Sequence, residues 1–364
     1  MTRLLMTADT VGGVWTYALE LADAIAPYDV ETHLATMGRR LSAEQHAAVK
    51  QSAIVEVHES DYALEWEHDP WADVERAGTW LLDLERAVDP HVIHLNGYVH
   101  GALRWRSPVV VAGHSDVLSW WQAVHGEAAP EEWSTYRDRV AAGLAGADAV
   151  VAPTADMLAA LTTWYGYRGG HVVPNGRSSD WVRYAGKEPL ILGAGRVWDE
   201  AKNLTLLQQV SAAMPWPVVI AGERSHPDAQ GNGFTFPGGT TRFVGQLPFE
   251  HLANRLLRAA IFVLPARYEP FGLGPLEAAQ AGCALVLGDI PSLREVWGPA
   301  ALYVSPDRPD ELEAVLLRLI DNPDELRAMS TLARARAEHY RPARMAQGYV
   351  RIYRRLPVRT GAPR

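Results

Sequence analysis

Two glutamates eight positions apart, Glu269 and Glu277, are the residues whose type and spacing point most directly to chemistry. The proline and glycines between them are incompatible with a continuous helix, so we expect Glu269 on a loop. Gly274 suits the N-cap of a following helix and Pro275 suits its first position, which makes Glu277 the third helical residue. A carboxylate on a loop beside a helix start can orient a polar ligand, so this segment predicts a binding site.

The start of that helix is a predicted anion site. The backbone amides of Phe271, Gly272 and Leu273 precede the helical hydrogen bonds and favour a phosphate group. Glu277 has a structural alternative, because glutamate at the third helical position commonly closes a capping box. Glu269 has a weaker alternative, since so constrained a loop rarely serves connectivity alone.

A second pair of charged residues, Arg196 and Lys202, lies six positions apart on a predicted strand-to-helix loop. The fork of the arginine and the ammonium of the lysine could together clamp two phosphates. The alternative is a surface ion pair with Asp199 or Glu200. The glycines before Arg196 do not complete a dinucleotide-binding fingerprint, because Trp198 stands where its third glycine would fall.

Three further candidates lie in the first half of the chain. Gly12 and Gly13 follow the first expected strand, where two glycines allow a ligand to approach the backbone closely or simply make a tight turn. His114 follows another strand and could bind a phosphate or a sugar hydroxyl, or serve as a structural histidine. Trp120 and Trp121 could wall an acceptor pocket or pack the domain.

These loops need strands and helices that bring them to one edge of a sheet. Short β-rich runs alternate with helical stretches, which predicts parallel sheets covered on both faces and ligands beyond the carboxyl ends of the strands. The polar stretch at residues 174–180 separates two sets of six strands, so the predicted fold class is α/β, with two doubly wound Rossmann-like domains and a cleft between them. The expected strands are Arg3–Thr7, Thr32–Ala35, Ile54–Val57, Val92–Leu95, Pro108–Ala112, Ala149–Ala152, Pro189–Leu192, Pro217–Ala221, Arg242–Val244, Ile261–Leu264, Ala284–Leu287 and Ala301–Val304, and expected helices include Val14–Ile25, Glu75–Val88, Asn203–Ala213, Leu276–Ala281 and Glu311–Ile320.

Composition argues against several classes of protein. Acidic residues outnumber basic ones by 43 to 34, and a formal charge of −9 disfavours a general nucleic-acid binder. No apolar run reaches the roughly eighteen residues of a membrane span, and Asp9 follows the first strand so soon that we expect no secretory leader. The single cysteine, Cys283, indicates a cytoplasmic protein. The arginine-rich stretch at residues 327–364 is either a solvated helix face or a peripheral contact for an anionic membrane or partner.

The segment from Glu269 to Glu277 resembles the signature of retaining glycosyltransferases of family 4, which have the GT-B fold. The resemblance continues along nearly the whole chain in the expected order, and it is closer in the C-terminal half. The other matching positions are Gly12-Gly13 in the first loop, His114, Pro174-Asn175-Gly176 at the domain junction, Gly195-Arg196 with Lys202-Asn203, and Gly245 near the base.

The resemblance implies a division into domains. Residues 1–176 would form the acceptor-side domain and residues 177–340 the nucleotide-sugar-binding domain. Residues 341–357 would form a C-terminal helix that crosses back to the first domain.

The resemblance also implies a role for each residue on the donor side. Arg196 and Lys202 would hold the donor diphosphate and neutralise the charge that builds on it. Glu277 would accept hydrogen bonds from the ribose hydroxyls. Glu269 would fix the donor sugar and the distal phosphate, together with the amides of Phe271, Gly272 and Leu273.

The remaining matched residues belong to the acceptor-side domain. His114 would contact the sugar or its phosphate, and Gly13, after Gly12, would let the first loop close over the diphosphate. The family uses no metal or other cofactor, and this chain has no Asp-x-Asp motif. His91 and His94 would point to opposite faces of their strand, so they are a poor metal pair.

The sequence therefore predicts a metal-independent hexosyltransferase of carbohydrate biosynthesis that retains anomeric configuration. Its substrates would be a nucleotide diphosphate sugar, for which UDP-glucose is the single best prediction, and a soluble hydroxyl acceptor. An epimerase with the same fold is an alternative, although it would lack the Glu269–Glu277 pair. A catalytically silent sugar-nucleotide-binding subunit is another, although it would typically have lost Glu269, Lys202 or Arg196, and all three are present.

Overall fold

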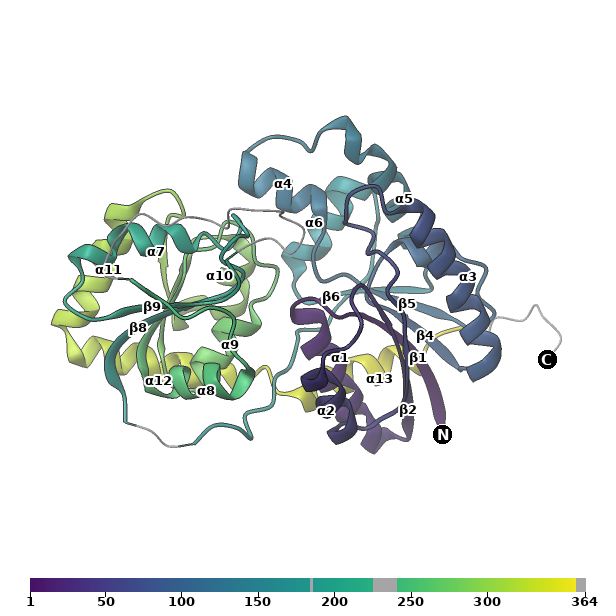
Figure 1. Cartoon of the computed structure of the whole chain (residues 1–364), viewed down its shortest axis with the longest axis horizontal. Helices are drawn as coiled ribbons and strands as arrows, with labels where there is room; N and C mark the ends of the chain where they lie inside the picture. Colours follow the sequence, from purple (N-terminus) through teal and green to yellow (C-terminus); the bar gives the residue numbers. More distant parts are fainter. Residues whose placement is uncertain (184–185, 225–240, 358–364) are drawn as a thin grey trace. The chain divides into compact units, whose positions relative to one another are not determined.

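The computed structural model describes residues 1–183, 186–224 and 241–357, and the chain divides into two compact units (Figure 1). The first unit contains Met1–Gln122, Glu127–Gly176 and the C-terminal segment from Arg341, and the second contains Ala123–Gly126 and Arg177–Tyr340. Within the described residues, no helix is both long enough and apolar enough to cross a membrane.

The first unit is built on a seven-stranded sheet with the order β3-β2-β1-β4-β5-β6-β7, in which every pairing is parallel. Its strands are β1 (Thr2–Asp9), β2 (Val30–Met37), β3 (Ile54–Glu59), β4 (Val92–Leu95), β5 (Val109–Ala112), β6 (Ala149–Ala152) and β7 (His171–Val172). Its helices are α1 (Gly13–Ile25), α2 (Ala43–Gln51), α3 (Trp71–Val88), α4 (Val117–His125), α5 (Ser134–Gly146), α6 (Ala155–Tyr165) and α13 (Pro342–Tyr353).

Successive residues of β1 enter different cores. Leu4 and Met6 join one buried cluster, which includes residues of α1 and α13, whereas Leu5 joins another that includes residues of α3 and α5. Since neighbouring side chains of a strand point to opposite faces, this sheet is covered on both sides, as a run of apolar residues predicts.

The second unit repeats this arrangement with six parallel strands in the order β10-β9-β8-β11-β12-β13. The strands are β8 (Glu188–Ala194), β9 (Val218–Ala221), β10 (Arg242–Phe243), β11 (Ala259–Leu264), β12 (Ala284–Gly288) and β13 (Leu302–Val304). The helices are α7 (Leu204–Val210), α8 (Phe249–Arg258), α9 (Leu273–Gln280), α10 (Pro291–Trp297), α11 (Pro309–Asp321) and α12 (Pro323–Ala337). Both sheets are doubly wound, so the predicted class of fold is confirmed.

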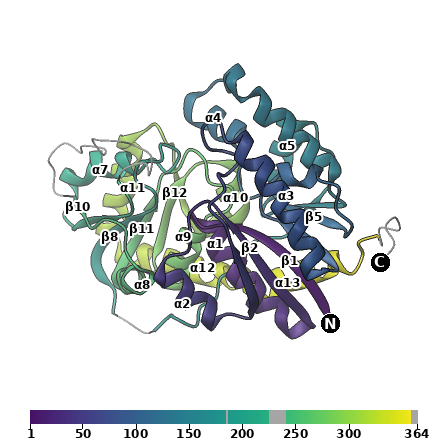
Figure 2. The same ribbon diagram turned by 45° about the vertical axis from the view of Figure 1, so that its right-hand side comes forward.

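Helix α13 packs on α1, although it follows the last helix of the second unit in sequence (Figure 2). Its residues Met345 and Tyr349 are buried in the core that α1 shares. Space is tight where it packs, since a Cβ on Gly348 would lie 2.7 Å from the side chain of Val173. The C-terminal helix is therefore a built-in part of the first unit.

The helix after Glu269 starts earlier than its sequence predicts. The structure places the N-cap at Gly272, with a φ of 90°, and the helix begins at Leu273. The predicted cap at Gly274 is wrong by two residues, because a proline is tolerated throughout a first turn and Gly272 accommodates the left-handed backbone. Strand β7 was also not expected, since two exposed residues are too short to show a strand pattern.

Candidate active site

Two loops of the second unit leave the sheet side by side. One follows β8 and carries Arg196 and Lys202, and the other follows β11 and carries Glu269. Strands β8 and β11 are parallel neighbours, so their carboxyl ends reach the same edge of the sheet. Polar ligands bind such sheets at this edge.

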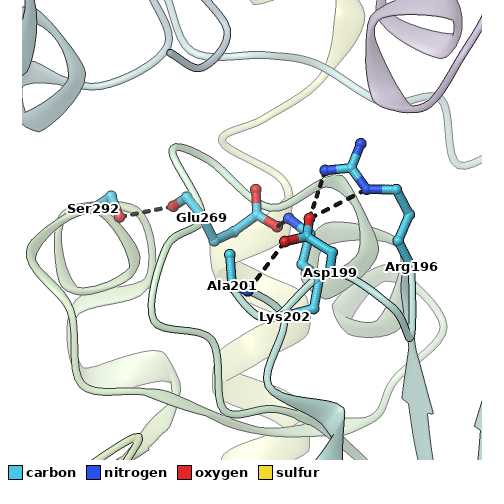
Figure 3. A network of polar contacts seen from close by, with 6 residues as sticks. All are labelled: Arg196, Asp199, Ala201, Lys202, Glu269 and Ser292. Carbon is cyan, nitrogen blue, oxygen red and sulfur yellow. Dashed lines mark hydrogen bonds and ion pairs between the residues drawn. The ribbon is translucent and has the colours of Figure 1, made fainter. Parts of the chain in front are cut away.

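The two loops meet in an ion pair between Lys202 and Glu269 (Figure 3). The Nζ of Lys202 donates to Oε2 of Glu269 at 2.8 Å, and each side chain is only 16% exposed. Ser292, at the start of α10, donates its hydroxyl to the backbone oxygen of Glu269 at 2.7 Å. The loop is thus fixed through its side chain and its backbone, and Ser292 is a supporting residue that sequence reasoning missed.

Arg196 is oriented by Asp199, which is one of the two acidic partners that the sequence offered as an alternative. Its Nε and Nη2 donate to Oδ2 of Asp199 at 3.2 and 2.7 Å. Asp199 is almost fully buried, and its Oδ1 also accepts from the amide of Ala201 at 3.0 Å. The side chain of Arg196 is 40% exposed, so the pairing orients this charge without burying it. Figure 3 shows Asp199 beside the guanidinium.

Asn203 ties the first of these loops to its surroundings. Its backbone is left-handed, with a φ of 53°, and its side chain donates to the backbone oxygens of Pro265 and Pro306 at 2.9 and 2.8 Å. Pro265 opens the loop that carries Glu269, so Asn203 holds the two loops in register. Matching Asn203 to the family pattern indicated its position, and the structure supplies the reason for an asparagine.

Gly222, at the end of β9, is another residue that sequence reasoning missed. A Cβ on Gly222 would lie 1.7 Å from the backbone oxygen of Gly195, so no side chain fits there. Its amide donates to the backbone oxygen of Gly245 at 2.8 Å. A glycine directly after a buried strand was the available sequence signal.

The N-terminus of α9 lies directly after Glu269. None of the hydrogen bonds found among the described residues uses the amides of Gly272, Leu273 or Gly274. A Cβ on Gly272 would lie 3.4 Å from Cγ of Glu269, which places the helix start against that side chain. With the helix starting at Leu273, Gly274 joins the predicted amide donors.

Glu277 forms a second nearly buried ion pair, with Arg177. The Nε of Arg177 donates to Oε1 of Glu277 at 2.7 Å, and the guanidinium carbon lies 4.5 Å from the centre of the Phe249 ring. The side chain of Gln280 donates to the backbone oxygen of Arg177 at 2.8 Å. Glu277 is the fifth helical residue, so the capping-box alternative is wrong, and Arg177 is a partner that sequence reasoning missed.

In the first unit, the loop after β1 contains both predicted glycines. Gly12 is the N-cap of α1, with a φ of 96°, and both Gly12 and Gly13 are exposed. Just before them, Thr10 exchanges two hydrogen bonds with the backbone of Arg39, at 2.8 and 3.0 Å. Thr10 therefore anchors the segment, and the backbone of the two glycines that follow is exposed.

His114 follows β5 and lies close to Asn96, which follows β4. The two side chains meet at 2.8 Å, between Nε2 of His114 and Oδ1 of Asn96. Burial lowers the pKa of His114 to about 4, and burial together with the nearby His114 lowers the pKa of His94 to about 3. His91, just before β4, is exposed and accepts from the amide of Arg3 at 3.0 Å, whereas His94 is buried within the strand.

The two tryptophans proposed for the acceptor lie on α4, the helix after the His114 loop. The rings of Trp120 and Trp121 are 6.2 Å apart in an edge-to-face arrangement, and both are half-buried. Asp116 begins this helix, accepting from the amide of Ser119 at 2.9 Å and from the hydroxyl of Tyr165 at 2.7 Å. Burial raises the pKa of the Asp116 carboxyl.

The predicted residues therefore fall into two groups. The second unit brings together Arg196, Lys202, Glu269 and the start of α9 at one sheet edge, with Glu277 on the same helix. The first unit carries the Gly12–Gly13 loop and His114 after strands of its own sheet.

Comparison with known families accounts for most of the chain. Residues 11–181 match the family described as Glycosyltransferase Family 4, and residues 182–336 match the one described as Glycosyl transferases group 1. The chain belongs to the family 4, group 1 glycosyltransferases. The resemblance seen in the sequence is thereby confirmed.

Curated relatives of this family 4 member align over limited stretches. An MMP alpha-(1->4)-mannosyltransferase from Mycolicibacterium hassiacum is 38% identical over 117 residues, which are 31% of this chain and 28% of the relative. A glycogen synthase from Mycobacterium tuberculosis is 40% identical over 98 residues, which are 26% of this chain and 24% of the relative. These alignments span about a quarter of the relatives' own lengths.

Solved structures resemble this family 4 member over nearly its whole length. A sucrose-phosphate synthase from Thermosynechococcus elongatus has a TM-score of 0.78 at 19% identity, covering 97% of this chain and 98% of that one. Anabaena HepE in complex with UDP-glucose has a TM-score of 0.75 at 15% identity, covering 98% and 100%. At these identities the likeness shows the fold alone, which is GT-B, as the sequence predicts.

Proposed function

We propose that this protein is a retaining hexosyltransferase that moves a hexose from a nucleotide diphosphate sugar to a hydroxyl of a soluble acceptor in the cytoplasm. One observation carries the proposal. The Lys202–Glu269 ion pair lies beside the uncommitted amides of α9, at the sheet edge that also bears Arg196. Positive charge, backbone donors and a carboxylate are the groups that a sugar diphosphate needs.

The proposed chemistry follows from where charge would develop. When the bond between the anomeric carbon and the phosphate oxygen breaks, negative charge collects on the departing diphosphate. Lys202 and Arg196 would neutralise that charge, and the amides of Leu273 and Gly274 would add backbone donors. Glu269 would orient Lys202 and accept a hydroxyl of the donor sugar. These groups supply positive charge from the chain itself, so we propose that no metal is required.

The remaining residues would divide between nucleoside and acceptor. Glu277 would accept from the ribose hydroxyls, held in place by its ion pair with Arg177. In the first unit, the Gly12–Gly13 loop and His114 would contact the transferred sugar. Trp120 and Trp121 would lie on the acceptor side, a proposal that is supported only by their position on α4.

For the donor we propose UDP-glucose, and GDP-mannose is the second candidate. The first is supported by the structural likeness to HepE, which was solved with UDP-glucose. The second is supported by relatives described as mannosyltransferases, one of them GDP-mannose-dependent. Hydrogen bonds to a base at the Gly245 loop would decide between them.

A thermal-shift panel with UDP, GDP, ADP, UDP-glucose and GDP-mannose in EDTA tests the proposal. A nucleotide that binds only the folded protein should raise its melting temperature by about 5 °C or more at 100 times its Kd. The shift should vanish in Lys202→Ala and survive in Arg258→Ala, which breaks an exposed ion pair with Glu188 in the same unit. If no compound moves the melting temperature at millimolar concentration, the proposal fails.

Turnover separates a transferase from a silent binding subunit. We expect slow release of the nucleoside diphosphate from its sugar even without an acceptor, because water can replace the acceptor hydroxyl. Nucleotide binding without any release, and without transfer to a panel of sugar acceptors, would favour the silent subunit. Return of the donor as a different sugar would favour the epimerase.

A further inference from the structure

A network of hydrogen bonds, half-buried at His114 and Asn96 and buried at His94 and Tyr353, connects His114 to the C-terminal helix of the first unit. Oδ1 of Asn96 faces Nε2 of His114 at 2.8 Å and Nε2 of His94 at 3.1 Å. Nδ1 of His94 in turn faces the hydroxyl of Tyr353, on α13, at 2.6 Å. Tyr353 lies 259 positions after His94, so the network joins the region of β4 and β5 to helix α13.

At Asn96, the donor and the acceptor of each hydrogen bond in this network can be assigned. The side-chain nitrogen of Asn96 donates to the backbone oxygen of Thr7 at 2.7 Å, and the amide of Asn96 donates to the hydroxyl of Thr7 at 2.9 Å. A backbone carbonyl can only accept, so the amide nitrogen of Asn96 must face Thr7. Its oxygen must therefore face the two histidines, and that oxygen can only accept.

This direction determines where the protons of both histidines lie. His114 and His94 must each carry a hydrogen on Nε2 to donate to Asn96. Both rings are neutral near pH 7, because burial lowers the pKa of His114 to about 4 and that of His94 to about 3. A neutral imidazole has one N–H, so Nδ1 of each ring has a free lone pair. Nδ1 of His94 accepts from Tyr353, and Nδ1 of His114 is left as an acceptor without a partner among the described residues.

Packing holds the His114 ring in this position. The ring of Tyr17 meets His114 edge-on, with centres 4.4 Å apart, and the hydroxyl of Tyr17 also lies 3.4 Å from Nε2 of His94. The ring of Tyr349, on α13, meets the ring of Tyr17 edge-on, with centres 6.1 Å apart. His94 has no exposed surface, so water does not compete for these hydrogen bonds.

We propose that Asn96, His94 and Tyr353 are positioning residues that hold His114 as its Nε2–H tautomer, so that Nδ1 accepts a hydrogen bond from a substrate hydroxyl. The contact with a substrate rests on the proposed function, whereas the tautomer does not. An acceptor nitrogen cannot bind an ionised phosphate oxygen, so the partner of His114 is a sugar hydroxyl. Helix α13 thereby supports the active site through Tyr353.

Long-range ¹H–¹⁵N spectra of the full protein labelled in histidine read the tautomer directly. We expect His114, assigned with a His114→Gln variant, to show the Nε2–H pattern at pH 7. Asn96→Ala should convert much of it to the Nδ1–H form. A wild-type His114 that is charged, or that is protonated on Nδ1, would overturn the inference before any variant is made.

Two tyrosines of α13 provide a matched pair of variants. Tyr353→Phe removes the donor to His94, whereas Tyr349→Phe removes a buried hydroxyl of the same helix and keeps every hydrogen bond to the imidazole nitrogens. We expect the turnover of UDP-glucose or GDP-mannose to fall about tenfold in Asn96→Ala and about fivefold in Tyr353→Phe, with nucleotide Kd unchanged. Tyr349→Phe should keep wild-type turnover while its melting temperature falls by about as much as that of Tyr353→Phe.

The two possible failures can be told apart. If the wild type turns over no nucleotide sugar, the proposed function fails, and the spectra still decide whether the network sets the tautomer. If turnover is present and falls equally in Tyr353→Phe and Tyr349→Phe, or if Asn96→Ala leaves the tautomer unchanged, the positioning role is wrong. Should Asn96→Ala fail to fold, the wild-type spectrum and the tyrosine pair give the answer.

Discussion

The candidate residues of the second unit are ions, each held by an opposite charge. Lys202 is paired with Glu269 at 2.8 Å, and Arg196 is paired with the buried Asp199 at 2.7 Å. Their ammonium and guanidinium groups lie at a sheet edge next to backbone amides of α9 that donate to no other described residue. This arrangement suits a ligand that carries negative charge.

The candidate histidine of the first unit, His114, is neutral and belongs to a hydrogen-bond network that continues into the buried His94. His114 has a lowered pKa, and among the described residues it contacts the side chain of Asn96 and the ring of Tyr17. A neutral ring with a free lone pair suits hydroxyl groups rather than phosphates. The comparison teaches that the two units present different chemistry, charged groups in the second and a neutral hydrogen-bond acceptor in the first, which is the division that the proposed function requires.

The largest effect should come from changing the charged candidate residues of the second unit. Glu269→Gln leaves Lys202 beside a neutral group, so we expect turnover of the nucleotide sugar to fall about 100-fold while nucleotide Kd changes little. Glu188→Gln is the control, since it neutralises a carboxylate in an exposed ion pair of the same unit. Turnover within a few-fold of the wild type would show that Glu269 has no role in transfer.

Gly222 tests whether the position of the Arg196 loop depends on close backbone packing. Gly222→Ala should destabilise the second unit by about 2–3 kcal/mol and weaken nucleotide binding, because the new Cβ would push Gly195 away. Gly186→Ala is the matched control, since a Cβ there meets nothing within 4 Å. Equal melting temperatures for the two variants would contradict the packing argument.

The neutral side should respond to pH. The folded-state pKa of His94 is about 3, below about 6.5 for an unfolded chain, so the unfolded chain binds more protons as pH falls from about 6.5. The stability that His94 contributes is therefore present above pH 6.5 and is lost toward pH 3, at about 1.4 kcal/mol per pH unit. The stability difference between the wild type and His94→Gln should shrink by about 2 kcal/mol from pH 7 to pH 5. A constant difference, measured by denaturant unfolding at each pH, would mean that His94 is not buried as a neutral ring.

The smallest effect should be that of salt. Raising ionic strength from about 0.05 M to about 0.5 M should weaken nucleotide binding by about threefold to tenfold, because Arg196 is partly exposed to screening ions. Stability without nucleotide should change little. A nucleotide Kd that did not vary with salt would place the ligand away from the Arg196 loop.

The charged residues of the second unit could be singled out from the sequence because their signals are local. The spacing of Glu269 and Glu277, and of Arg196 and Lys202, follows strands whose apolar runs are easily recognised. The pairings themselves could not be predicted, since Lys202 meets Glu269 across 67 positions and Arg177 meets Glu277 across 100. The two-residue error at α9 has a similar origin, because Gly272 and Gly274 are equally good caps until the backbone conformation is known.

The hydrogen-bond network around His114 in the first unit was much harder to predict. His114 was identified by its place after a strand and by its match to the family pattern, whereas His94 was considered only as a metal ligand with His91. Asn96, the partner of His114, follows a different strand from His114, and Tyr353, a partner of His94, lies on α13. Hydrogen bonds of this kind depend on tertiary packing, which leaves no periodic pattern in the sequence.

The most direct test of the account is calorimetric titration of the full protein with UDP and GDP in EDTA, for the wild type and Lys202→Ala. The account predicts that one nucleotide binds the wild type without metal and that Lys202→Ala weakens this binding by at least about tenfold. Arg258→Ala should bind like the wild type. Equal affinity in Lys202→Ala and the wild type would contradict the central claim that the Lys202–Glu269 pair forms the diphosphate site.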